Sequence, residues 1–463
     1  MKRKHNALAI ALAGSMWAAL ALHGHAQTPT ANGNPIAPHI YAADPSAHVW
    51  PEDPDTLYLY TSVDTPGTNH HASMASYHVF STRDGSNWID HGEVLSVDRV
   101  NWAVSHAWAI DAVFHEGKYY LVYCMKNLKD GLFSTGLAVS DRPEGPFEDT
   151  GVIEGVENGQ DPALFIDDDG RKYLYWGYGH RIFGAELNTD LRSIKPETKI
   201  ELSGQLEDAF EGPWMNKING VYFLSYPGLP AKKWPQHMYY ATAQSPLGPF
   251  EPKGKFMEGF DGQAGTNHGS IVKWRDKWVF FYHSAWVSGG NGTNRSLMAD
   301  FLNLSPDGRF SLASPTRSGI AANGTGRTIL RLEAENGRAA GGFLKGATAG
   351  ADTSGYSGRG YVTNFASFES LVGVSAYLAK PQSMKLNVRY SAPKDTHVFV
   401  MVNETNINGG YEAYREIVLK GNEGFADADL GVVDLKAAAN LITLASRNES
   451  GLKIDYFELI PLP

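Results

Sequence analysis

The sequence predicts an all-β protein in which a five-bladed β-propeller is followed by a β-sandwich of the jelly-roll type. Five segments share one pattern: a polar residue precedes an apolar strand, a tight turn and an aromatic-rich strand. They begin at Asp44, Asp111, Asp161, Glu211 and His268, which are 67, 50, 50 and 57 positions apart. Antiparallel repeats of about fifty residues are typical of propellers, with one blade per repeat.

Each repeat is expected to begin with a β-hairpin. The two strands of a repeat are separated by turns that carry Gly or Asp, such as His115-Glu116-Gly117 and Ile218-Asn219-Gly220. These residues suit tight antiparallel turns. The first strand of a propeller blade lines the central channel, so the five leading polar residues are expected to converge around one axis. A sandwich or a β-solenoid would not explain why a polar residue opens every repeat.

The pattern changes after the fifth repeat. Residues 313–328, ASPTRSGIAANGTGRT, are rich in Gly, Ser, Thr and Pro and are predicted to form a linker. From Leu332 onward, alternating apolar and polar residues indicate the strands of a β-sandwich. We therefore expect a propeller over residues 27–320 and a sandwich over residues 329–463.

The N-terminus has the pattern of a secretory signal peptide. Basic residues at positions 2–4 precede an apolar stretch from Ala7 to Leu22 and a small-residue site that ends at Ala26. This order is typical of a signal peptide over residues 1–26, and it predicts an exported protein, periplasmic or secreted. A membrane anchor is the weaker interpretation because the apolar run is short, and no later segment approaches twenty apolar residues.

Composition narrows the class of ligand. The chain has 11 Trp and 22 Tyr, and its formal charge of −10 arises from 40 basic and 50 acidic residues. An acidic balance argues against nucleic acid as a partner. Trp and Tyr often form core, but they also stack on flat, hydroxyl-rich ligands such as sugars. Cys124 is the only cysteine, which excludes an intramolecular disulfide.

Four of the five leading residues are acids, and this recurrence is the main indication of chemistry. Asp-Pro and Glu-Gly-Pro also occur as turn formers at strand starts, which would explain any single occurrence. Several acids in one channel would repel one another and raise the pKa of at least one of them. Hydrolysis of a glycosidic bond with inversion needs two carboxyl groups, one to activate water and one to protonate the leaving oxygen.

The segments around these acids resemble glycoside hydrolase family 43, whose members are five-bladed propellers with an Asp base, an Asp that tunes the acid and a Glu acid. YAADPSAHVW resembles the first motif of the family and implies that Asp44 is the base. QDPALFIDDDG implies that Asp161 tunes and orients the acid, and FEGPWM implies that Glu211 is the proton donor. The resemblance covers nearly all of residues 34–312 and includes AWAIDAVF, where Ile110 replaces the family's Pro.

Four further residues are candidates for substrate binding: Trp108, Asp111, His268 and Arg295. Trp108 is expected to be either a stacking wall of the site or a core aromatic between blades. His268, in TNHGSIV, resembles a His at the propeller axis that often holds a metal ion or water; the alternative is a structural residue. Arg295, in GTNRSLMADFLNLSPDG, matches a family Arg that pairs with the tuning carboxylate, so it is expected to keep Asp161 ionised.

The C-terminal domain resembles carbohydrate-binding module family 6 in its LEAE opening, its GYV segment and its IDYFEL ending. This resemblance implies that Glu335 and Asp455 help to hold a structural calcium ion. The Trp that this family has before the final strand is missing, because Gly451-Leu452-Lys453 stands there. No cofactor is expected for the chemistry itself.

These resemblances imply an inverting, exo-acting hydrolase of plant cell-wall hemicellulose. SAWVSGGNGTNRS and the appended module favour α-L-arabinofuranosidase activity on arabinoxylan or arabino-oligosaccharides. The alternatives are a β-xylosidase, a galactan- or galactofuranose-directed hydrolase and a non-catalytic sugar-binding propeller, because pocket loops choose the sugar. A chain cut near Gly324 is expected to fold and to cleave small aryl glycosides, with losses mainly on polymer.

Overall fold

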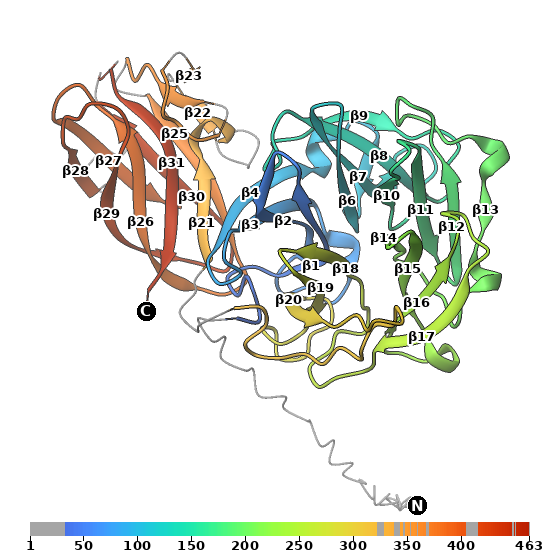
Figure 1. Ribbon diagram of the computed structural model, residues 1–463. Coiled ribbons are helices and arrows are strands. Elements are labelled where there is room, and N and C mark those ends of the chain that lie inside the picture. The colour runs from blue at the N-terminus through green and yellow to red at the C-terminus, as the bar shows by residue number, and fades with distance from the viewer. Residues whose placement is uncertain are drawn as a thin grey trace, which may run out of the picture.

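The computed structural model is built almost entirely of β-strands (Figure 1). It describes residues 33–321, 328–337, 343–345, 348–351, 353–358, 360–366, 370–403, 415–446, 449 and 451–462. The predicted signal peptide and the cut site at Gly324 lie outside these ranges. The helices are short 3-10 turns: His71–Ser73, Val97–Arg99, Pro196–Thr198, Ser203–Gln205, Pro230–Lys232 and Ala334–Asn336. None of the helices in the described ranges is long and apolar enough to span a membrane.

The first part of the chain forms five antiparallel sheets, one for each repeat. The first sheet contains β1 (Ala42–Trp50), β2 (Asp53–Val63), β3 (Ser76–Thr82) and β4 (Trp88–Ser96). The second contains β6 (Ile110–His115), β7 (Lys118–Asn127), β8 (Phe133–Ser140) and β9 (Glu148–Val152), with β5 (Ala103–Ser105) beside β7. The third contains β10 (Ala163–Ile166), β11 (Lys172–Tyr178), β12 (Arg181–Glu186) and β13 (Ile200–Glu201). The fourth contains β14 (Trp214–Ile218), β15 (Val221–Gly228), β16 (His237–Ala243) and β17 (Glu251–Met257), and the fifth contains β18 (Ser270–Trp274), β19 (Lys277–Ser284) and β20 (Ser296–Leu302).

The first strands of the five sheets form a closed ring. β1 contacts β6 and β18, and β6 contacts β10. β14 closes the ring because it contacts both β10 and β18. Figure 1 shows β1, β6, β10, β14 and β18 grouped around the centre, with β13 and β17 at the rim. The ring therefore brings together the starts of all five repeats, which is what the repeat pattern predicted.

The predicted hairpins are confirmed. Glu116 (φ 49°) and Gly117 (φ 77°) join β6 to β7, and Asn219 (φ 51°) and Gly220 (φ 80°) join β14 to β15. Positive φ at both central residues gives the turn whose twist matches that of the flanking strands, and Asn and Gly adopt it at low cost.

The segment before β1 covers the open edge of the three-stranded fifth sheet. The backbone N–H of Ile36 donates to the carbonyl of Leu297 in β20 at 2.9 Å. The side chain of Asn34 donates to the carbonyl of Ala299 at 3.0 Å. This contact ties the start of the ring to its end, so the fifth sheet becomes a neighbour of the first.

The second domain consists of two sheets that share one core. One contains β21 (Thr328–Glu333), β31 (Lys453–Pro461), β26 (Gln382–Ser391), β29 (Ala426–Leu435), β24 (Tyr361–Thr363) and β23 (Thr348–Gly350). The other contains β22 (Phe343–Lys345), β25 (Leu371–Leu378), β30 (Ala438–Ser446), β27 (Thr396–Val402) and β28 (Arg415–Leu419). Val374 and Leu444 from one sheet pack with Val388 and Phe457 from the other, and all four are fully buried.

The segment predicted as a linker, residues 313–328, packs against the first domain in its described parts. The N–H of Ala313 donates to the carbonyl of Phe256 at 2.6 Å, and Ile320 is only 5% exposed. At the other end, Thr328 begins β21, which pairs in parallel with β4 of the first sheet. A composition rich in Gly, Ser and Pro does not reveal such contacts, because they form with residues distant in sequence. The two domains are therefore joined by a continuous sheet.

Candidate active site

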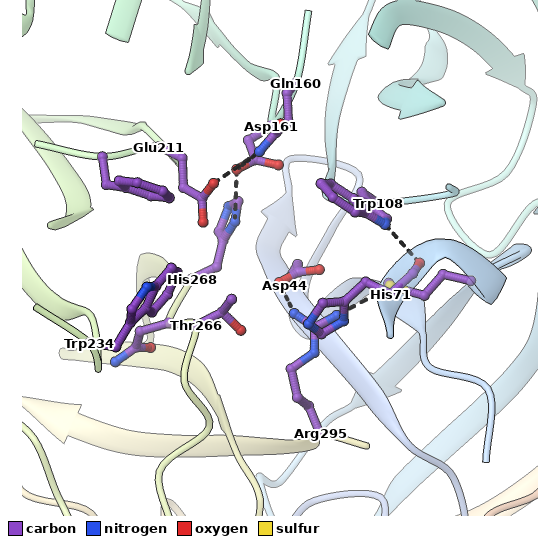
Figure 2. A pocket seen from close by; sticks show the side chains of 13 residues that line it. Asp44, His71, Trp108, Gln160, Asp161, Glu211, Trp234, Thr266, His268 and Arg295 are labelled. Atoms are coloured by element: carbon purple, nitrogen blue, oxygen red, sulfur yellow. Dashed lines mark hydrogen bonds and ion pairs between the residues drawn. The ribbon is translucent and has the colours of Figure 1, made fainter. Parts of the chain in front are cut away.

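A pocket of about 230 Å³ opens at the centre of the ring (Figure 2). It is lined by Asp44, His71, Met74, Trp108, Gln160, Asp161, Phe210, Glu211, Trp234, Thr266, Asn267, His268 and Arg295. The structure thus brings together the three predicted acids and three of the four predicted substrate-binding residues. The exception is Asp111.

Local backbone geometry turns the acids into the pocket. Asp44 and Asp161 both have a φ of 52°, in the left-handed region that a non-glycine residue adopts rarely and often at functional sites. Asp44 also lies at a register shift between β1 and β2, and such bulges redirect side chains. Gly212 (φ 58°) follows Glu211, and a Cβ on it would lie 2.9 Å from the Pro227 ring. Only glycine fits there.

A fixed positive charge holds Asp44. Its carboxylate accepts from Arg295 Nη1 at 2.9 Å and from Ser62 Oγ at 2.7 Å. Burial is the largest single influence and raises the pKa of Asp44, but the charge of Arg295, the contributions of His268 and His283 and the Ser62 hydrogen bond together outweigh it. The pKa of Asp44 is therefore held well below its ordinary value, and the group is ionised across the working range of an enzyme.

Arg295 is held in turn by Asp64, which sequence reasoning missed. Arg295 donates to Asp64 from Nε at 3.0 Å, from Nη2 at 2.8 Å and from its backbone N–H at 2.7 Å. The prediction that Arg295 pairs with Asp161 is corrected: its ion-pair partners are Asp44 and Asp64. Arg295 precedes β20 of the fifth sheet, and closure of the ring places that sheet beside the first sheet.

Neutral amides hold Glu211. Gln160 Nε2 donates to Oε2 at 2.9 Å, and Gln236 Nε2 donates to Oε1 at 2.8 Å. The N–H of Asn267 donates to Gln236 Oε1 at 2.6 Å, which fixes the orientation of that amide. Burial raises the pKa of Glu211, the Gln236 hydrogen bond lowers it and the charge of Asp44 raises it, and the result is a pKa of about 7.

Asp161 shares this acidic environment. Gln160 Nε2 lies 3.5 Å from Asp161 Oδ2, so one amide bridges Asp161 and Glu211. Burial, followed by the charges of Glu211 and Asp44, raises the pKa of Asp161 well above its ordinary value. His268 Nδ1 lies 3.9 Å from Asp161, and burial lowers the pKa of this histidine. Asp161 and Glu211 therefore titrate as a pair.

Asp111, the fourth residue predicted to bind substrate, does not line this pocket. It lies inside β6 and faces a separate cavity on the channel, where it accepts from Ser46 Oγ at 2.7 Å and from the N–H of Leu164 at 2.7 Å. Ser46 and Leu164 come two and three residues after Asp44 and Asp161. Asp111 is thus deeper in the channel than the other acids, although its repeat pattern looks the same.

Aromatic side chains line the rim of the pocket. Trp108 donates from Nε1 to the carbonyl of His71 at 2.9 Å and packs against Phe133, with ring centroids 4.6 Å apart. Trp234 is 55% exposed and packs edge-on against Phe210 at 5.5 Å. Sequence reasoning missed Trp234 because its segment carries no repeat signal. The exposed face of Trp234 suits stacking against a sugar ring.

The two residues predicted to bind calcium lie in the second domain. Asp455 accepts from the N–H of Ser357 at 2.9 Å and pairs with Arg389 Nε at 3.0 Å. A Cβ on Gly358 would lie 2.3 Å from Glu335 Oε1 and 2.9 Å from Glu333 Oε2. The three carboxyl groups therefore converge on one turn. Among the described residues, no group of three or more His, Cys, Asp or Glu side chains is arranged so that it could hold a metal ion.

The two sides of the pocket carry the two states that glycosidic hydrolysis requires: a carboxylate that stays ionised and a carboxyl group that keeps its proton up to about neutral pH. This pair of acids at the centre of the ring indicates a glycoside hydrolase. The chain belongs to glycosyl hydrolases family 43, whose model matches residues 32–310. It is a glycosidase of the xylosidase/arabinosidase type.

Individual relatives agree with this assignment. Xylosidase/arabinosidase 43A of Humicola insolens is 34% identical over 61% of this chain and 99% of its own length. A β-xylosidase/α-arabinofuranosidase from a compost metagenome, solved with xylotriose in a calcium-free form, is 31% identical with a TM-score of 0.55, over 62% of this chain and 98% of its own. The arabinoxylan arabinofuranohydrolase of Bacillus subtilis, 20% identical with a TM-score of 0.57, covers 94% of this chain and 99% of its own, which extends the likeness in fold to both domains.

Proposed function

We propose that the enzyme removes terminal α-L-arabinofuranosyl units from arabinoxylan or arabino-oligosaccharides, and that terminal β-xylosyl units are its second substrate. A pocket of about 230 Å³ lies below the usual range of about 300–1,000 Å³ for ligand sites, which supports one sugar unit at a time and exo action. Relatives whose names combine xylosidase and arabinosidase activity, and a relative solved with xylotriose, support the second substrate.

The single observation that carries the mechanism is the contrast between the two acids. Asp44, held ionised by Arg295, removes a proton from water as the water attacks the anomeric carbon. Glu211, protonated below a pKa of about 7, donates its proton to the leaving oxygen. Asp161 lies beside Glu211, shares its Gln160 amide and tunes its pKa. For inversion, we expect the carboxyl groups of Asp44 and Glu211 to be roughly 6.5–9.5 Å apart.

We also infer that the ring is a five-bladed β-propeller and that the second domain is a jelly-roll of the carbohydrate-binding module family 6 type. The closed ring of first strands and the two-sheet core support these architectures. Export to the periplasm or medium is proposed from the pattern of residues 1–26. N-terminal sequencing of the mature protein tests this, and a chain that still begins at Met1 would contradict it.

Two ions are proposed, neither of which supplies the hydrolytic step. Calcium at Glu335 and Asp455, with Glu333 as a third oxygen donor, would relieve the repulsion among carboxylates that face the same turn. An ion near His268 would be held by the His268 imidazole and by Asp161, whose carboxylate lies 3.9 Å from the imidazole, together with water. Calcium is expected to raise the melting temperature of the full chain and EDTA to lower it. Equal melting temperatures would contradict the calcium site.

A panel of aryl glycosides, read together with product analysis on arabinoxylan, tests the assignment. We expect release of arabinose from the aryl α-L-arabinofuranoside, slower release of xylose from the aryl β-xyloside and single sugars from polymer. Proton NMR of the first product is expected to show inverted anomeric configuration. Oligosaccharide products would contradict exo action, and a preference for the aryl galactofuranoside would contradict the pentose assignment.

A further inference from the structure

The second domain contacts the first domain at a second place besides the pairing of β4 with β21. The last residues of β25 and the start of its connection to β26, residues Tyr377 to Lys380, pack against the ring. The N–H of Ala379 donates to the carbonyl of His39 at 2.6 Å, and Lys380 Nζ donates to the carbonyl of Val287 at 2.6 Å. Ala379 and Val287 are buried together with Tyr41, at 6%, 1% and 5% exposure. We refer to residues 377–380 as the sandwich tip.

The sandwich tip contacts two loops of the ring that are tied to each other. One loop follows β2 and the other precedes β20. Asn294 Nδ2 donates to the carbonyl of Thr65 at 2.9 Å, and the N–H of Gly67 donates to Asn294 Oδ1 at 3.1 Å. Lys380 holds the loop before β20 through Val287, and the phenol of Tyr377 interacts with the side chain of Thr65 on the other loop.

These loops also carry the clamp on Asp44. Asp64 immediately precedes Thr65, and Arg295 immediately follows Asn294. Asp64 and Arg295 are paired, and Arg295 Nη1 donates to Asp44 at 2.9 Å. A continuous set of contacts therefore runs from the second domain to the carboxylate proposed as the base. None of the tip residues lines the pocket.

We propose that the sandwich tip positions Asp44 by holding the two loops that carry Asp64 and Arg295, so that the second domain is part of the catalytic unit. The proposal rests on the function proposed for Asp44. Tyr377 and Lys380 are positioning residues, because they act through the loops. The expectation that a chain cut near Gly324 keeps its activity on small aryl glycosides is revised, since removal of the second domain also removes these contacts.

The test uses the full chain with Tyr377→Phe and Lys380→Met combined. Misplacement of a catalytic group by about 1 Å can cost roughly a hundredfold in rate, so partial loosening is expected to lower kcat on the aryl α-L-arabinofuranoside about tenfold. KM is expected to change less than about twofold, because the groups that line the pocket remain. Lys380→Arg is expected to keep the parental kcat, since the guanidinium can donate to the Val287 carbonyl. The matched control is Lys420→Met, an exposed lysine of the same domain paired only with Asp395 among the described contacts.

Hydrogen exchange separates this proposal from the proposed function. In an Asp44→Asn background, the double variant is expected to show faster amide exchange in peptides over residues 64–74 and 285–295 than the same background with an intact tip. Parental kcat together with parental exchange in the double variant would overturn the proposal. Retained activity in Asp44→Asn alone would overturn the role of Asp44, while the exchange result would still decide whether the tip holds the loops. If the double variant does not fold, Tyr377→Phe alone decides by the same two measurements.

Discussion

Asp44 and Glu211 lie on two sides of one pocket, and burial raises the pKa of both, yet they end in opposite protonation states. Asp44 faces a guanidinium group that a second carboxylate holds in place, whereas Glu211 faces two amides whose donors carry no net charge. The guanidinium of Arg295, together with the other groups around Asp44, overcomes the cost of ionising that buried carboxyl group, whereas the two amides around Glu211 do not. The chemistry of the neighbours, and not the depth of burial, therefore separates the base from the acid.

Removal of either acid is expected to have the largest effect. Asp44→Asn eliminates the base, so activity on all substrates is expected to fall by about 10²- to 10⁴-fold, with partial recovery when azide supplies a nucleophile.

Glu211→Gln removes the proton donor, so the loss is expected to be large for poor leaving groups and small for activated aryl glycosides. Rates with two leaving groups measure this. Asp111→Asn is the matched control, because this acid lies in the channel outside the pocket; equal losses for Glu211→Gln on both substrates would contradict its role.

Loss of the positive charge tests the base side of the comparison. In Arg295→Gln, the largest influence that opposes burial of Asp44 is lost, so the pKa of Asp44 is expected to rise. Because the base works only when ionised, the acid limb of the pH profile of kcat/KM moves to higher pH, and activity is lost as pH falls through the raised pKa. Arg275→Gln, at an exposed arginine, is the control. An unmoved acid limb would show that Arg295 does not set the state of Asp44.

Loss of an amide donor tests the acid side. Gln236→Leu removes the hydrogen bond to Glu211 Oε1, which favours the ionised form, so the pKa of Glu211 is expected to rise by about one unit. The alkaline limb of the pH profile then moves to higher pH. The Arg295 variant also shifts its limb to higher pH, but there the shifted group is the base Asp44 and the limb is the acid one. Gln205→Leu, at a glutamine that accepts from the N–H of Phe250, serves as the control. A shift to lower pH would contradict the arrangement.

The smallest effect is expected outside the two acids. Trp234→Ala removes the exposed ring at the rim, so KM for oligosaccharides is expected to rise roughly two- to tenfold, while kcat/KM on aryl monoglycosides stays nearly constant. Trp234→Phe is expected to retain most of the affinity. Steady-state kinetics on both substrate types measure the difference, and an equal change on both would contradict a role of Trp234 that is limited to the longer substrates.

Much of the first domain was predictable because its information is local. The turn residues at Glu116-Gly117 and Asn219-Gly220 fix the positions of two hairpins to within a few residues. The number of repeats predicts the number of sheets in this domain. Asp44, Asp161 and Glu211 could be selected from short motifs that begin equivalent repeats, and all three line the pocket. Each of these features depends on residues close together in the sequence.

The sequence by itself therefore determined the number of sheets, the positions of their hairpins and the acids at their starts. Only the tertiary structure decided that Asp111 lies deeper than its neighbours, that Arg295 pairs with Asp44 and Asp64, and that β21 continues the first sheet. The physical reason is that these features depend on the register between sheets and on the closure of the ring. Both are set by contacts between residues that are far apart along the chain, and no local pattern records them.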